Sequence, residues 1–68
     1  MKKFMNTDAE FIAMMIITFL DGHSSVESLN NYYRLNIQAI TTVKSLDVLA
    51  HEKVINAFKA EKQRILLT

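Results

Sequence analysis

The sequence contains no cysteine, no proline and no tryptophan, and its single glycine is Gly22. Without cysteine, no disulfide can stabilise the fold, which fits a reducing compartment, and we expect a cytoplasmic protein. Strands joined by hairpins need turn residues, so a chain with one glycine and no proline disfavours a β fold. The scarcity of turn residues therefore predicts an all-α protein.

An excess of charge of one sign is also missing. Eight lysine and arginine residues face seven aspartate and glutamate residues, which leaves a formal net charge of +1. A protein that binds nucleic acid normally has a basic patch, and in this chain such a patch can only be local.

The apolar run over residues 11–20 is about half the length of a helix that spans a bilayer. Lys2 and Lys3 precede it as in a signal peptide, but Asp8 and Glu10 intervene and no small-x-small cleavage site follows. We therefore expect neither a signal peptide nor an association with membranes.

The length of 68 residues corresponds to one small domain. A chain of this size buries only ~60% of the surface that it exposes when unfolded, so its own core is marginal and dimerisation often adds stability. We expect a flexible segment over residues 1–6 and a single domain over residues 7–68 that forms a homodimer.

Two capping-box sequences mark the starts of helices. Thr7 with Glu10 predicts a helix from residue 7 to about residue 20, which ends before Gly22 because glycine tolerates a left-handed conformation. Ser24 with Glu27 predicts a second helix, with Ser24 as its N-cap.

The first expected helix is apolar nearly all round. One broad face is expected to enter the core, and it comprises Phe11, Ile12, Met15, Ile16, Phe19 and Leu20. A second stripe contains Met14 and Ile17, which belong either to the core of a central helix or to a dimer interface.

The stretch over residues 24–43 has the spacing of a helix-turn-helix. Its apolar residues stand where such a motif needs core contacts, and they are Leu29, Tyr33, Leu35, Ile40 and Val43. Arg34 and Leu35 are expected to form the turn, and Asn36 to cap the next helix. Tyr32, which precedes Tyr33, is expected at the surface.

The helix after this turn presents an uncharged polar face opposite its apolar face. Gln38, Thr41, Thr42 and Ser45 point outward at 100° per residue, with Asn36 and Ile37 at the start of the helix. In a helix-turn-helix these positions meet base edges in the major groove. The residues expected to contact phosphates are Ser24, Ser25, Arg34 and Lys44.

The last segment, about residues 47–66, is predicted to be a C-terminal amphipathic helix that closes the core, with Asp47 as a possible cap or with no break from the preceding helix. Its apolar face contains Val48, Val54, Ile55, Phe58 and Ile65. Phe58 and Ile65 are also candidates for a dimer interface, together with Met14 and Ile17. The result is a small four-helix domain around a trihelical core.

The segments Gly22-His23-Ser24 and Tyr33-Arg34-Leu35-Asn36 carry a family likeness. Over about residues 15–46 the chain resembles the PapB/FocB type of adhesin-biosynthesis transcription regulators, and the arrangement is similar in KorA-type plasmid repressors. The resemblance implies an oligomeric, all-helical regulator that binds double-stranded DNA site-specifically. It places DNA-reading positions on Gln38, Thr41 and Thr42, with Asn36 and Ile37 at the helix start.

The sequence gives little support to a metal-binding or enzymatic function. His51-Glu52 resembles the start of a zinc-binding motif, but the second histidine that the motif needs one turn later is missing. The other histidine, His23, has no metal-ligating residue type next to it in a recognised spacing. We expect no catalytic residue, metal, cofactor or small-molecule substrate, and hence no enzyme. The alternative to a DNA-binding regulator is a phage- or plasmid-type module that binds a host regulator or enzyme through apolar helix faces.

Overall fold

The computed structural model describes residues 6–67, with side chains from residue 8 onward. Within that range the chain forms four helices and no strands: α1 (Asn6–Thr18), α2 (Val26–Leu35), α3 (Ile37–Leu46) and α4 (Val48–Leu67). The expected all-α, four-helix fold is confirmed. The expected flexible segment over residues 1–6 lies outside the described residues except for Asn6, which begins α1.

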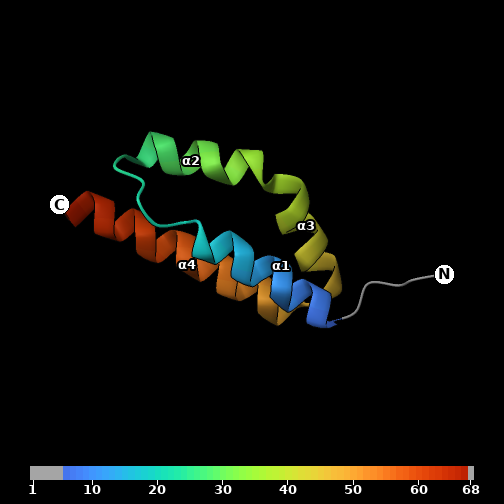
Figure 1. Cartoon of the computed structure of the whole chain (residues 1–68). Helices are drawn as coiled ribbons and strands as arrows, with labels where there is room; N and C mark the ends of the chain where they lie inside the picture. Colours follow the sequence, from blue (N-terminus) through green and yellow to red (C-terminus); the bar gives the residue numbers. More distant parts are fainter. Residues whose placement is uncertain (1–5, 68) are drawn as a thin grey trace.

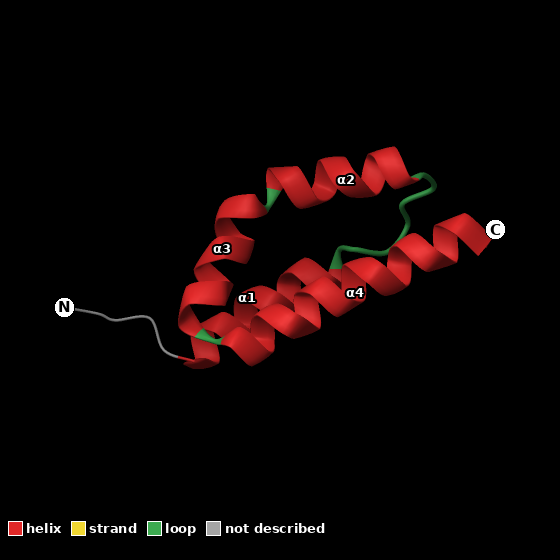
Figure 2. Ribbon diagram, turned by 180° about the vertical axis from the view of Figure 1, so that it is seen from behind, coloured by secondary structure: helices red, strands yellow, loops and turns green. Residues whose placement is uncertain are grey.

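The helices form an elongated bundle. Helices α1 and α4 lie side by side and run in the same direction, while α2 returns above them in the opposite direction (Figure 1). Helix α3 crosses from the end of α2 to the start of α4 at one end of the molecule (Figure 2). Helix α4 packs on all three other helices, whereas α1 packs on α3 and α4 only.

The core is built where α1, α3 and α4 meet. Ile40 and Val43 of α3 and Val54 of α4 are its largest fully buried side chains. Small residues on the facing surfaces of α1 and α4, such as Ala13 and Ala50, are also buried and let the two backbones approach closely. The spacing argument that places Ile40 and Val43 on an inner face is confirmed.

The side of α1 that faces the core matches the expected one at Ile12, Ile16 and Leu20 only. The buried residues are Ala9, Ala13 and Ile16 of α1 and Leu20 just after it, whereas Phe11 and Met15 of α1, and Phe19 after it, are exposed. Periodicity could not separate these stripes because the helix is apolar on every side. Val48 of α4, also expected in the core, is exposed.

The helix ends show how local sequence acts. Ser25, not Ser24, is the N-cap of α2, and its hydroxyl accepts a hydrogen bond from the Ser28 N–H at 3.1 Å. Gly22 adopts a φ of 92°, as its place after α1 requires. Helix α1 begins one residue before Thr7, whose side chain lies outside the described ones, and ends at Thr18.

The connection between α2 and α3 is shorter than a helix-turn-helix predicts. Helix α2 continues through Arg34 and Leu35, and Asn36 alone separates it from α3. Leu35, expected in the core of the turn, is 85% exposed. The Asn36 backbone has φ −106° and ψ 14°, close enough to helical values for the chain to bend without a longer turn.

Asp47 separates α3 from α4 with an extended backbone. Its carboxylate accepts hydrogen bonds from the Leu49 N–H at 3.0 Å and the Ala50 N–H at 3.4 Å. These are the N–H groups that an N-cap satisfies, so Asp47 caps α4 and the two helices are distinct.

Candidate nucleic-acid interface

The outward side of α3 carries the polar face that the sequence predicts. Gln38, Thr41 and Ser45 are exposed, at intervals of three and four residues, and they lie opposite the buried Ile40 and Val43. Ile37 is also exposed and adds an apolar side chain at the start of the same face. Packing of the inner face thus fixes which side chains α3 offers to a ligand.

Two hydroxyls of α3 already donate hydrogen bonds to backbone carbonyls of the same helix. Thr42 donates to the Gln38 carbonyl oxygen at 2.9 Å, and Ser45 donates to the Thr42 carbonyl oxygen at 3.0 Å. Thr42 is also half-buried. Each hydroxyl keeps only its acceptor capacity, so Gln38 and Thr41 are the stronger candidates for contacts to base edges.

Asn36 does not act as expected. Its side-chain Nδ2 donates to the Tyr32 carbonyl oxygen at 2.8 Å, and it makes no capping hydrogen bond to α3. The amide therefore adds a second donor at the C-terminal end of α2, to a carbonyl that also accepts from the Asn36 backbone N–H at 3.2 Å. It is half-buried, which separates it from the exposed reading positions.

The cations and the serines stand at different places on the molecule. Arg34, at the end of α2, and Lys44, on α3, are both exposed and lie on the two elements that meet at Asn36. Ser24 and Ser25 precede the opposite end of α2, a ten-residue helix about 15 Å long. The two cations thus lie on either side of the α2–α3 junction, whereas the serines lie at the far end of α2.

The candidate dimer residues divide into two groups. Met14 is exposed, and Ile17 and Ile65 are partly buried against the core. Phe58 is only 8% exposed, and its ring contacts Tyr32 and Tyr33 with centroid distances of 5.9 Å and 5.1 Å. Phe58 is thus a core residue of the single chain and offers little surface to a second copy.

A polar cluster that sequence reasoning missed links the loop between α1 and α2 to the C-terminal part of α4. Arg64 donates to both carboxylate oxygens of Glu61, at 2.7 and 3.0 Å, and to the His23 carbonyl oxygen at 2.9 Å. The His23 ring bonds Ser28 at 2.8 Å and lies against the ring of Tyr32. The only sequence signal was the i, i+3 spacing of Glu61 and Arg64, which does not reveal the contact with His23.

The fold and site define a small all-α domain in which α3 has an exposed polar face and α1 has an exposed apolar side. Comparison with protein-family models, with curated proteins and with solved structures found no match. No helix in the range 6–67 combines the length and hydrophobicity needed to cross a membrane. Within the same range, no three His, Asp or Glu side chains are grouped so as to hold a metal ion.

Proposed function

We propose that this chain is a sequence-specific DNA-binding regulator that places α3 in the major groove. One observation carries the proposal: Gln38, Thr41 and Ser45 form an exposed, uncharged polar row on the side of α3 opposite the core. The resemblance of residues 15–46 to PapB/FocB-type regulators points to the same helix. An α-helix with such a row fits the width of the major groove.

The chemistry of the row suggests which bases it reads. A glutamine amide can donate to and accept from one adenine edge, and a threonine methyl can pack on the methyl group of thymine. Gln38 and Thr41 are therefore assigned to A·T base pairs. Arg34 and Lys44 are assigned to phosphates, where they hold the helix in register without reading sequence.

The test begins with selection of duplexes from a random library by the purified chain. Binding of the selected duplex and of a scrambled duplex is then measured for wild type and for the double variant Gln38→Ala/Thr41→Ala. We expect the double variant to lose affinity for the selected duplex by about 1–3 kcal/mol per lost base contact while its affinity for the scrambled duplex is unchanged.

Gln63→Ala is the matched control because Gln63 is an exposed glutamine on another helix, α4. It is expected to bind both duplexes like wild type. Failure of the library to yield an enriched sequence, or equal discrimination by wild type and the double variant, would overturn the assignment of α3.

A further inference from the structure

A groove between α2 and α4 combines an apolar lining with four polar side chains. It has a volume of about 280 Å³ and lies where the ring of Tyr33 meets the ring of Phe58 edge-on, at a centroid distance of 5.1 Å. Its apolar part consists of the buried Leu29 and Phe58 and the half-buried Ile55. The polar side chains that line it are Asn30, Tyr33, Lys59 and Lys62. An apolar groove with a few polar groups is the usual form of a small-molecule site.

The four polar side chains of this groove have no hydrogen-bond or ion-pair partner within residues 8–67. None of the hydrogen bonds and salt bridges in this range uses the side chain of Asn30, Tyr33, Lys59 or Lys62. Neighbouring groups of the same kinds are occupied, since the Tyr32 hydroxyl and the Asn36 amide bond to backbone carbonyls and Arg64 bonds to a carboxylate. The groove therefore gathers polar groups that remain available to a ligand.

The charge of the groove is positive. Two lysines line it and no acid does, because the acids of α2 and α4, which are Glu27, Glu52 and Glu61, all lie outside its lining. Lys59 and Lys62 are three residues apart, so they are neighbours on the surface of α4. Two like charges at this spacing are unfavourable, and an anion between them replaces repulsion by attraction. The groove thus selects a ligand with a negative charge.

The polar and apolar parts lie at different ends of the groove. Ile55 stands seven residues before Lys62 on α4, which separates the two by about 10 Å. Because α2 runs opposite to α4 and Tyr33 meets Phe58, Asn30 lies one turn further toward Lys62 (Figure 1). A ligand with an anionic head and an apolar body matches this order, with its body toward Ile55.

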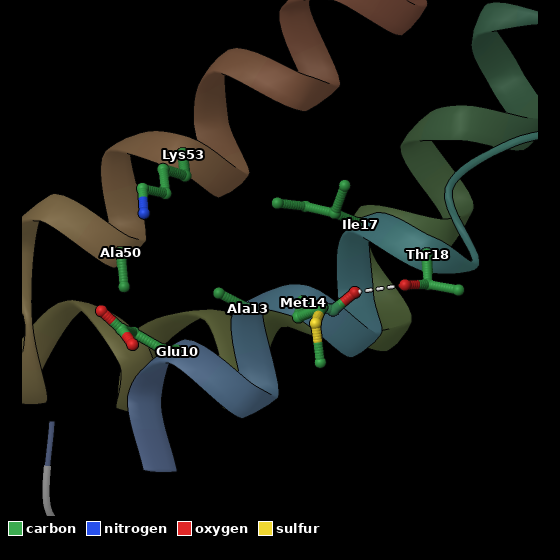
Figure 3. A pocket seen from close by; sticks show the side chains of 7 residues that line it. All are labelled: Glu10, Ala13, Met14, Ile17, Thr18, Ala50 and Lys53. Atoms are coloured by element: carbon green, nitrogen blue, oxygen red, sulfur yellow. Dashed lines mark hydrogen bonds between the residues drawn. The ribbon is translucent and has the colours of Figure 1, made fainter. Parts of the chain in front are cut away.

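The groove between α1 and α4 is a poorer match for a charged ligand. It has a volume of about 380 Å³, and Glu10 and Lys53 lie on either side of Ala50 along it (Figure 3). One charge of each sign leaves its lining without net charge. The hydroxyl of Thr18, which also lines it, already donates to the Met14 carbonyl oxygen at 2.7 Å. The excess of positive charge therefore distinguishes the groove between α2 and α4.

We propose that the groove between α2 and α4 binds a small amphipathic carboxylate, whose head pairs with Lys59 and Lys62 and whose apolar body packs on Ile55 and Phe58. The volume is just below the range of roughly 300–1,000 Å³ that holds drug-sized ligands, so the ligand is smaller than these. Octanoate has the required head, body and size. The ligand is bound and not converted, and the inference does not rest on DNA binding.

The experiment titrates octanoate into the isotopically labelled full chain and follows the backbone amide signals by NMR. Wild type is expected to show saturable shifts confined to α2 and α4 around the groove, with a dissociation constant on the order of 1 mM. Butyrate, which has the same head and a shorter body, is expected to bind about tenfold more weakly because it covers less apolar surface. Octylammonium, which has the opposite charge, is expected not to bind.

Charge reversal tests the two lysines. Lys59→Glu/Lys62→Glu should lose octanoate binding and acquire binding of octylammonium, and Lys59→Gln/Lys62→Gln should bind neither ion tightly. Lys53→Glu is the matched control, because Lys53 is an exposed lysine of α4 outside this groove, and it should bind octanoate like wild type. Thermal unfolding should show that all three variants are folded, since the substituted lysines are exposed.

Three results overturn the proposal. They are an absence of saturable octanoate binding by wild type, equal affinity for octanoate and butyrate, and unchanged octanoate binding by both double variants. If wild type binds no octanoate but Lys59→Gln/Lys62→Gln loses affinity for DNA, the lysines contact phosphates and the groove holds no carboxylate. Because the titration contains no DNA, its failure is distinguishable from failure of the proposed function.

Discussion

The hydroxyl of Tyr32 in α2 donates a hydrogen bond to the carbonyl oxygen of Ile16 in α1, over 2.8 Å. That carbonyl lies in the last turn of α1, where the Leu20 N–H donates to Ile17 instead. Tyr32 therefore satisfies a carbonyl that the end of the helix leaves unpaired. The residue expected at the surface fastens α2 to α1, and burial raises the pKa of its hydroxyl above the ordinary value.

Removing that hydroxyl should destabilise the fold. Tyr32→Phe is expected to lower the free energy of unfolding by about 1 kcal/mol, since it deletes one hydrogen bond to a helix end. Urea denaturation measures this, and Tyr33→Phe is the control because no hydrogen bond holds the Tyr33 hydroxyl among the described residues. An equal loss in both variants would contradict the capping role.

The same tyrosine predicts a change in stability at alkaline pH. Because its folded pKa is raised, its contribution to stability is complete below the ordinary value of 10.0 and is lost as the pH rises through the folded pKa. Wild type should therefore lose stability above about pH 10 more steeply than Tyr32→Phe. Parallel alkaline profiles of unfolding free energy would argue against this.

The Glu61–Arg64 pair predicts a change at acid pH. The hydrogen bonds from Arg64 hold the pKa of Glu61 below its ordinary value, so this stabilisation is complete above about pH 4.5 and is lost as the pH falls toward the lowered pKa. Glu61→Gln should flatten the acid limb of the melting temperature. Arg64→Lys keeps the charge but loses the paired geometry and the contact with His23, so it should lower the melting temperature at neutral pH.

Two leucines of α2 distinguish the observed junction from a helix-turn-helix with a packed turn. Leu29 is buried and Leu35 is exposed. Leu29→Ala should cost about 2–5 kcal/mol of unfolding free energy through the cavity that it leaves. Leu35→Ala should change it by no more than about 0.5 kcal/mol. A large loss at Leu35 would show that the turn packs as the sequence pattern predicts.

The cations near α3 can be tested by salt dependence. Each phosphate contact contributes about one unit to the slope of the logarithm of affinity against the logarithm of salt concentration. Arg34→Ala and Lys44→Ala should each lower the slope by about one unit on selected and scrambled duplexes alike. Lys59→Ala on α4 serves as the control, and a slope that changes equally in all three variants would remove the assignment.

Local interactions made much of the fold predictable. The scarcity of turn residues predicted the all-α class, the left-handed conformation after α1 was predicted from Gly22, and a cap at Asp47 was one of two alternatives for the start of α4. The spacing of Ile40 and Val43 predicted both the inner face of α3 and its polar outer row. In each case the pattern and its consequence lie within a few residues, where helical periodicity determines direction.

Tertiary packing decided the rest. Helix α1 is apolar all round, so its own residues could not indicate that its alanine stripe, and not Phe11 and Phe19, would face α4. Of two adjacent tyrosines, only the approach of α1 selects Tyr32 to bond Ile16. Arg64 reaches His23 across 41 positions of sequence. The sequence by itself determined where helices form and which face of α3 is polar. Which apolar surfaces are buried was decided by the fit between helices. The hydrophobic effect is non-directional, whereas close packing requires surfaces of complementary shape.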